Sequence, residues 1–507
     1  MPRFKDYDYN QMKMIPLSFD KQILPGSFEY SLCYLIDHEI DQKIFYHRYI
    51  NDGNGRPAYD PALLLKIVIL AYSKGVTSSR KIEALCRENI IFMAISADTR
   101  PHFTTVADFI SCSTDEIASL FKQVLLMCDD LGLIGRDMFA VDGCKLPSNA
   151  SKDWSGTKAE LKKKQDKIDK AVRFMLDKHK QTDIKEQKGE ILNREQHQIE
   201  KLKAVSKKIK RFLAENDDRT GVSGNVIKSN ITDNDSAKMK TSHGVIQGYN
   251  GVAAVDSKHQ IVVAAEAYGQ GQEHNLLEPM VEQAHKNLKH TKAEKQKIKI
   301  TADSGYSNKQ TLVYLDDNGI NGYVADTGFR SRDPRFKDYK AHDAKNRSKK
   351  TSRFKVEDFD VDLKKQHCIC PAGKHLWLKT ATAKINDGEF MQFQAYEADC
   401  STCHLKTQCL RQVDQKTPRQ VNIKVGSTDK KKSSLVEKMK QKIDSDKGRH
   451  IYSQRLGTVE PVFGHINTMI GIKRFGLRGK TKVNAQWQLI TMVHNILKIH
   501  RYGWQWG

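Results

Sequence analysis

The stretch Met138-Phe-Ala-Val-Asp-Gly-Cys144 decides the fold, because a short apolar run here ends on a carboxylate, Asp142. A run of this length next to a glycine is typical of a buried β-strand. A second stretch, Lys297-Ile-Lys-Ile-Thr-Ala-Asp303, alternates apolar and polar residues and also ends on an acid. The alternation predicts another strand, with its odd and even side chains on opposite faces. Two strands that each end on an aspartate are therefore the nucleus of the predicted sheet.

Further strands are expected between and after these two. Residues 251–256 and 260–265 are apolar runs separated by Ser257-Lys-His259, which predicts a hairpin. Helices are expected at 275–288 and 308–318, with one more strand near 322–325. Antiparallel strands followed by strand-helix-strand predict a mixed α/β sheet.

The region before this predicted sheet has helical sequence patterns instead of strand patterns. Helices are expected at Pro61–Tyr72, at Lys81–Ile91 and from about Thr104. We therefore predict a helical N-terminal domain over residues 1–130. Short helices with scattered Arg and Lys are compatible with DNA binding of the helix-turn-helix type. A helical dimerisation or support domain is the alternative.

Two insertions are expected within an α/β domain made of residues 131–326 and 451–507. Residues 155–217 are highly charged and carry two apolar stripes at helical spacing, which predicts an antiparallel helical hairpin. Residues 327–450 are polar, rich in lysine and of less regular pattern.

The charge balance favours a polyanionic partner. The 507 residues contain 84 Lys and Arg against 61 Asp and Glu, a formal net charge of +23. Such a surplus suits nucleic acid, because each neutralised phosphate releases condensed counterions. No apolar run approaches the roughly 18 residues that span a bilayer. The N-terminus shows no secretion signal, so a cytosolic protein is expected.

Three acids lie where the predicted local structure changes. Asp142 and Asp303 end strands, and Glu460 is expected to open a helix with Pro461 in its first turn. Strand ends and a helix start can converge on one point of an α/β sheet. Carboxylate oxygens are the ligands that Mg²⁺ prefers, and two such ions support in-line phosphoryl displacement. The alternative is that each acid caps a turn or stays exposed. Glu273 and His274 lie near a loop-to-helix junction and could approach the metal site, but a helix cap is favoured for them.

Several ordered motifs resemble the DDE transposases of bacterial insertion sequences, which have an RNase H-like catalytic domain. The motifs are Arg56-Pro-Ala-Tyr-Asp-Pro61, Gly75-Val-Thr-Ser-Ser-Arg-Lys81, Arg100-Pro-His-Phe-Thr-Thr-Val106, Phe139-Ala-Val-Asp-Gly143, Asn230-Ile-Thr-Asp-Asn-Asp-Ser236, Gln247-Gly-Tyr-Asn250, Thr301-Ala-Asp-Ser-Gly-Tyr306 and Val459-Glu-Pro-Val-Phe-Gly464. The resemblance covers about residues 15–500.

The resemblance implies roles for single residues. Asp142, Asp303 and Glu460 match the catalytic acids, which in this family bind Mg²⁺ or Mn²⁺ and catalyse strand cleavage and transfer. Tyr452 and Arg455 match part of a related DNA-contacting signature, although four residues instead of three separate Arg455 from Glu460. The expected lysine is replaced by Asn467, and Lys473 and Arg474 are the nearby candidates for its DNA contact.

The resemblance also implies partners. These are double-stranded DNA, both as the terminal inverted repeats of the element and as target, and a second copy of the chain in a homodimer at the bacterial nucleoid. Other possibilities are a non-catalytic DNA-binding regulator, an inactive transposase relic, and a nuclease that hydrolyses without strand transfer.

Five of the ten cysteines lie between positions 368 and 409. Cys370, Cys400, Cys403 and Cys409 could supply four thiolates to a structural Zn²⁺, with Cys368, His375 and His404 as substitutes. Free thiols are the alternative.

Overall fold

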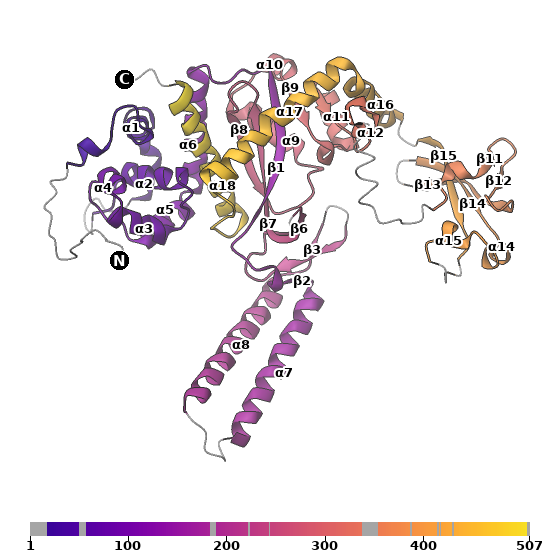
Figure 1. Cartoon of the computed structure of the whole chain (residues 1–507), viewed down its shortest axis with the longest axis horizontal. Coiled ribbons are helices and arrows are strands. Elements are labelled where there is room, and N and C mark those ends of the chain that lie inside the picture. Colours follow the sequence, from indigo (N-terminus) through magenta and orange to yellow (C-terminus); the bar gives the residue numbers. More distant parts are fainter. Residues whose placement is uncertain are drawn as a thin grey trace, which may run out of the picture. The chain divides into compact units, whose positions relative to one another are not determined.

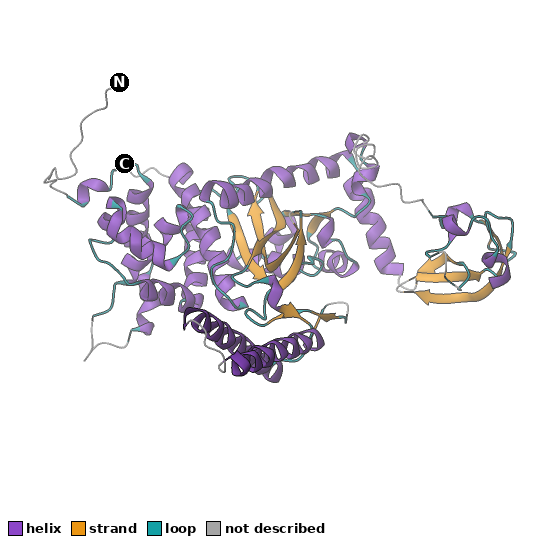
Figure 2. Ribbon diagram, turned by 60° about the horizontal axis from the view of Figure 1, so that its bottom comes forward, coloured by secondary structure: helices purple, strands orange, loops and turns teal. Residues whose placement is uncertain are grey.

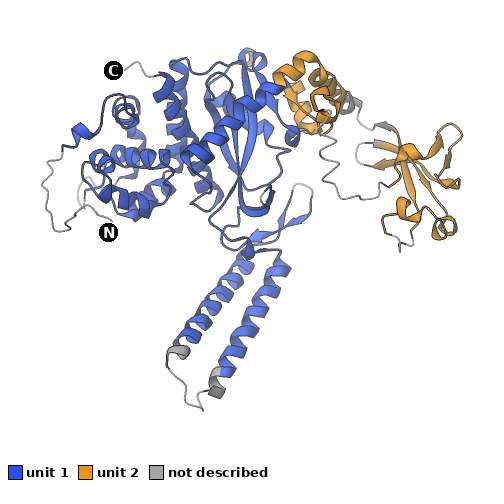
Figure 3. Ribbon diagram, viewed as in Figure 1, with its two compact units in different colours: residues 1–306, 320–322, 453–507 blue, residues 307–319, 323–452 orange. Residues whose placement is uncertain are grey.

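The computed structural model describes residues 18–49, 57–182, 189–221, 224–242, 244–336, 353–385, 388–412, 415, 417–427 and 430–503. Arg56 of the first motif and part of the turn expected between the two charged helices lie outside these residues. The chain forms two compact units (Figure 3). The first contains residues 1–306, 320–322 and 453–507, and the second contains 307–319 and 323–452.

A mixed sheet forms the centre of the first unit (Figure 2). Strand β1 (Met138–Pro147) pairs antiparallel with β7 (Gly244–Asp256) and parallel with β9 (Lys299–Ala302). Strand β7 also pairs antiparallel with β8 (Val262–Tyr268) and with β6 (Ala237–Thr241). At the other side of the sheet, β10 (Asn321–Val324) is the neighbour of β9. The expected RNase H-like α/β fold class is therefore confirmed.

Helix α18 (Lys480–Lys498) covers the free edge of β8 with a row of amide side chains. Asn495 accepts a hydrogen bond from the Val262 amide and donates one to the Val262 carbonyl, both at 2.9 Å. Asn484 accepts from the Ala267 amide at 2.9 Å. These bonds protect an edge strand that could otherwise pair with another chain. Deeper in the core, Trp487 donates to the Val252 carbonyl at 2.9 Å.

The N-terminal helices form a cluster in the same unit, in which α2, α5 and α6 pack against α18 (Figure 1). They are α1 (Phe28–Tyr34), α2 (Pro61–Ser73), α3 (Ser79–Glu88), α4 (Ile90–Ile95), α5 (Phe103–Cys112) and α6 (Thr114–Asp130). The single helix expected at 81–91 is wrong, because Asn89 ends α3 and caps α4 by accepting from the Ile91 amide at 3.0 Å.

Two long helices, α7 (Lys158–Thr182) and α8 (Gly189–Glu215), fill the charged region (Figure 1). Leu161 near the start of α7 and Ile209 near the end of α8 belong to one buried cluster, so the helices run antiparallel. Short strands flank their bases: β2 (Ser155–Gly156) pairs with β5 (Ser229–Asn230), and β3 (Arg219–Thr220) with β4 (Val226–Ile227).

Helix α17 runs from Asp446 to Gly464, so the expectation that Glu460 opens a helix is wrong. Pro461 lies inside this helix and cannot donate to the carbonyl of Gly457 four residues earlier. The side chain of Gln260 donates to that carbonyl instead, at 3.1 Å. A hydrogen bond from a distant segment thus compensates for a proline that local rules place at a helix start. A π-helical turn, His465–Ile470, follows.

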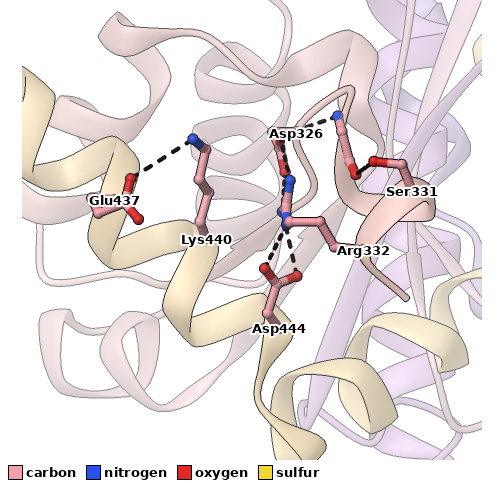
Figure 4. Close-up of polar contacts among 7 residues, drawn as sticks. Asp326, Ser331, Arg332, Glu437, Lys440 and Asp444 are labelled. Atoms are coloured by element: carbon pink, nitrogen blue, oxygen red, sulfur yellow. Dashed lines mark hydrogen bonds and ion pairs between the residues drawn. The ribbon is translucent and has the colours of Figure 1, made fainter. Parts of the chain in front are cut away.

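The second unit contains α11 (Lys309–Asp317), α12 (Phe329–Arg332) and α16 (Lys430–Asp444). Arg332 donates to Asp326 and to Asp444, with closest distances of 2.6 Å to each (Figure 4). Asp326 and Arg332 precede residues 353–427 in the chain, and Asp444 follows them. This ion-pair network therefore joins the chain before residues 353–427 to the chain after them.

That segment is a five-stranded antiparallel sheet, although its pattern predicted little regular structure. Its strands are β11 (Asp360–Asp362), β12 (His367–Ile369), β13 (His375–Ile385), β14 (Gly388–Gln394) and β15 (Gln420–Ser427), with helices α14 (Glu397–Ser401) and α15 (Lys406–Cys409). Among the described residues, its core cluster has six buried members, Phe359, Cys368, Leu376, Phe393, Ala395 and Val421. So small a core gives a weak hydrophobic signal in the sequence. In the described part of the chain, no helix is both long and apolar enough to cross a bilayer.

Candidate active site

Asp142 and Asp303 lie beside each other on neighbouring parallel strands. The pairing of β1 with β9 ends at Val141 opposite Ala302, and the next residue of each segment is the aspartate. Burial raises the pKa of Asp142, and the negative charge of Asp303 raises it further. Asp303 directly follows β9 as expected, but the expectation that Asp142 ends a strand is wrong, because β1 continues to Pro147. The structure nevertheless brings the two aspartates together.

Arg455 of α17 neutralises Asp142. Its Nη1 donates to Asp142 Oδ2 at 2.6 Å, while the Gly143 amide donates to Asp142 Oδ1 at 2.8 Å. The arginine side chain is only 7% exposed, and that of the aspartate 20%. The guanidinium opposes the effect of burial on the pKa of Asp142. One carboxylate thus has a cation and an amide donor fixed around it.

Glu273 is a third carboxylate at this place, and sequence analysis favoured a helix cap for it. That interpretation is wrong, because helix α9 (Leu277–Asn287) has no side-chain cap and Glu273 Oε1 accepts from Asn250 Nδ2 at 2.9 Å. A Cβ atom on Gly143 would lie 2.8 Å from Glu273 Oε1, and one on Gly305 would lie 2.7 Å from Glu273 Oε2. The two glycines therefore make room for the carboxylate.

Asp142, Asp303 and Glu273, which we call the acidic group, affect each other's pKa values through their charges. Burial raises the pKa of Glu273, Asn250 opposes this effect, and Asp303 and Asp142 reinforce it. Burial also raises the pKa of Tyr306 well above its usual value, with Glu273, Asp142 and Asp303 acting in the same direction. In the sequence, approach to the metal site was the less favoured interpretation for Glu273. No local pattern marks Tyr306 as a site residue, although Asn250 and Tyr306 each close a motif of the transposase resemblance.

The donor set suits a hard divalent cation, which prefers oxygen ligands. Besides the three carboxylates, Asn250 Oδ1 and the Tyr306 hydroxyl are buried and have no hydrogen-bond partner among the described residues. In the positions they occupy here, no three His, Cys, Asp or Glu side chains of the described chain are close enough to hold one metal ion. The chemistry of the group thus fits Mg²⁺, and binding would require the carboxylates to turn.

The other predicted site residues are dispersed. Glu460 is exposed on α17, five positions after Arg455. Tyr452 belongs to the second unit, where its ring packs on Phe329 at 4.9 Å. Lys473 and Arg474 are exposed after the π-helical turn, and Arg474 donates to Asn149 at 3.2 Å. Asn467, at the expected lysine position, donates to Cys144 Sγ at 3.4 Å.

A basic groove of about 720 Å³ lies next to the acidic group. Its cationic lining residues are Lys145, Arg219, Lys228, Lys238 and Lys240. Among the described residues that line it there is no Asp or Glu, although Lys228 pairs with Glu160 at 2.8 Å. Lys145 lines the groove and is also near the acidic residues, because its charge lowers the pKa of Glu273. Sequence analysis missed this groove, since its cations come from four separate segments.

Two family models match the chain. Residues 17–112 match the family described as Transposase domain (DUF772), and residues 369–500 match the family described as Transposase DDE domain. The first match spans α1 to α5, and the second runs from the cysteine-bearing sheet through Glu460 to α18. Searches of curated proteins and of solved structures return no match. The family matches confirm the resemblance to the DDE transposases of insertion sequences.

Proposed function

We propose that this chain, with its two transposase-family matches, is a DDE-type transposase that cuts DNA at the ends of its element and joins them to target DNA. The observation that carries the proposal is the adjacency of Asp142 and Asp303, which directly follow the last paired residues of the parallel strands β1 and β9. Carboxylates at this point of an RNase H-like sheet are suited to holding divalent metal ions.

The reaction consists of two phosphoryl transfers. In the first, a water oxygen bonds to phosphorus and the bond to the 3′ oxygen breaks, which leaves a 3′-hydroxyl on the element. In the second, that hydroxyl attacks a phosphodiester of the target, whose own 3′ oxygen leaves. Mg²⁺ or Mn²⁺ would lower the barrier by activating the attacking oxygen and stabilising the leaving one.

The residues of the chain have separate roles in this proposal. Asp142, Asp303 and Glu460 hold metal, with Glu460 brought to the site by a change in its position or in that of α17. Glu273 adds a further carboxylate, and Arg455 orients Asp142. Zn²⁺ at Cys370, Cys400, Cys403 and Cys409 would have a structural role and no part in these steps.

Double-stranded DNA is the proposed substrate. The basic groove beside the acids supports this, because its cations would follow the phosphate backbone. Exposed Lys473 and Arg474 offer further phosphate contacts, and Tyr452 and the N-terminal helices are additional candidates. Since two element ends must be joined in one event, we expect a homodimer, acting on the nucleoid in the bacterial cytoplasm.

A regulator that binds DNA without cutting it, or an inactive relic, is the second candidate. The observation that favours it is Asn467, which stands at the lysine position of the family signature and is engaged with Cys144. A cleavage and strand-transfer assay separates an active transposase from the regulator and the relic.

The test is a cleavage and strand-transfer assay on supercoiled plasmid that carries the element ends, with Mg²⁺ or Mn²⁺. Wild-type protein should nick and join DNA, whereas Asp142→Asn and Asp303→Asn should bind DNA but not cut it. Asp316→Asn is the matched control, because Asp316 is an exposed acid of α11. Undiminished cutting by Asp142→Asn would exclude the proposed mechanism. Binding without cutting by wild-type protein would support the regulator or the relic.

A further inference from the structure

Four cysteines from separate segments line one cavity in the second unit. Cys370 follows β12, Cys400 lies in α14, Cys403 follows α14, and Cys409 ends α15. All four border a cavity of about 30 Å³, a volume suited to a single small occupant. Cys370, Cys400 and Cys409 also pack against the small core of this sheet.

The turn at Cys370 directs a backbone donor at sulfur. Gly373 has φ +74°, which favours glycine, and its amide donates to the Cys370 carbonyl at 2.8 Å. The Lys374 amide then donates to Cys370 Sγ at 3.3 Å. A hydrogen bond to sulfur stabilises the thiolate, which is the form of cysteine that binds metal.

The charges around the cavity suit a cluster of thiolates. Its lining includes the cations Lys374, Lys406 and Arg419 and one acid, Asp399, which pairs with Lys374 at 3.7 Å. Four thiolates around a divalent cation carry two net negative charges, which the surplus cations would offset. Arg419 is fixed in place, because it donates to the Phe354 carbonyl at 2.9 Å and to the Cys409 carbonyl at 3.3 Å.

We propose that Cys370, Cys400, Cys403 and Cys409 bind one structural Zn²⁺. Each thiol gives up its proton when it becomes a ligand, so binding releases protons to solvent. Tetrahedral coordination by four thiolates is typical of structural zinc sites. In the described part of the chain no three of these sulfurs yet meet at a common point, so the side chains turn into the cavity on binding.

The remaining candidates are less suited as ligands. Cys368 is fully buried in the sheet core and does not line the cavity. His375 and His404 are exposed, and the ring of His375 packs on His367 at 4.4 Å. A metal has a clear role here, because a core of six buried residues stabilises a small sheet weakly.

The test is the metal content of the full-length chain, measured by inductively coupled plasma mass spectrometry after gel filtration. We expect about one zinc per chain in wild-type protein, and a loss of at least tenfold in the Cys400→Ser/Cys403→Ser variant. Cys368→Ala is the matched control and should keep its zinc. In wild-type protein, a thiol reagent should modify these four cysteines only after a strong chelator has removed the metal.

Two results would overturn the proposal. One is wild-type protein from zinc-supplemented cells that contains no zinc, and the other is full zinc content in the double variant. The proposal is independent of catalysis, because Asp142→Asn should contain as much zinc as wild-type protein. An inactive protein that binds zinc would therefore contradict the proposed function alone.

Discussion

Arg455 Nη1 lies 2.6 Å from Asp142 Oδ2, so a buried ion pair joins helix α17 to the central strand β1. The two residues are 313 positions apart in the chain. This contact fixes the part of α17 that follows Tyr452 against the strand that carries the first aspartate. It also places a positive charge next to Asp142, which opposes the effect of the negative charge of Asp303 on the pKa of Asp142.

Removing the arginine should therefore destabilise the first unit. For Arg455→Gln we expect the free energy of unfolding to fall by about 1–3 kcal/mol, because a largely buried carboxylate loses its charged donor. Arg455→Lys should recover part of this loss. Urea denaturation followed by circular dichroism measures the difference, and equal stability of all three proteins would show that the pair contributes nothing.

We expect efficient cleavage to require Glu273 in addition to Glu460. Glu273→Gln keeps an acceptor for Asn250 but removes a negative charge, so we expect cleavage to fall by about 10–100-fold with little change in DNA affinity. Stability should be unchanged or higher, since repulsion from Asp142 and Asp303 is relieved. Glu278→Gln, an exposed neighbour on α9, is the control and should cut at the wild-type rate. If Glu273→Gln also cuts at that rate, Glu273 has only a structural role.

The basic groove should determine the salt dependence of DNA binding. Lys238 and Lys240 are exposed and line the groove, so Lys238→Gln/Lys240→Gln should bind more weakly to every DNA sequence. The slope of log affinity against log salt should decrease in magnitude by about 1 for each phosphate that the variant no longer neutralises. Fluorescence anisotropy at four salt concentrations gives the slope, with Lys286→Gln on α9 as control. A slope identical to that of wild-type protein would place the DNA elsewhere.

Two buried histidines, His494 of α18 and His285 of α9, should make stability depend on pH. His494 Nε2 donates to the Gln260 carbonyl at 3.0 Å, so its Nδ1 must accept from His465 Nδ1 at 2.9 Å. Burial lowers the pKa of His494 to about 3 and that of His285 to about 4. Both are neutral in the folded state, whereas the unfolded chain takes up a proton below about pH 6.5.

Stability should therefore be complete above about pH 6.5 and fall as the pH decreases toward the folded-state pKa values. Between pH 7.5 and 5.5 each of the two histidines should contribute a loss of about 1 kcal/mol. Urea midpoints at three pH values test this. His494→Gln should show a shallower dependence on pH, whatever its absolute stability, and an unchanged dependence would exclude His494 as a source.

Local patterns predicted much of the central sheet. The strands around Asp142 and Asp303 follow from apolar runs and alternation. The adjacency of the two aspartates depends instead on the parallel pairing of β1 with β9, two strands that many other elements separate along the chain. Apolar residues also recur at helical spacing along residues 459–470, where Val459, Val462, Ile466 and Ile470 are buried and Phe463 is half-buried. Such features depend on the repeat of one helix or strand, which any short stretch of sequence displays.

Other features depend on contacts between distant segments. Pro461 was expected at a helix start, but α17 continues through it, and the Gly457 carbonyl accepts from the distant side chain of Gln260. Glu273 resembles a cap in sequence, but Asn250 and two glycines direct it toward the acids. The cysteine-bearing sheet was missed because its strands are short and its core is small.

The sequence by itself thus determined the α/β class, the two aspartates, the cationic character and the set of cysteines available for metal. The tertiary structure alone decided that Arg455 pairs with Asp142, that Glu273 joins the acidic group while Glu460 stays exposed, and that four cysteines share one cavity. The physical reason is that helix and strand patterns arise from neighbours along the chain. A charged or thiol side chain instead takes its partner from whichever segments the packing of the whole core brings near.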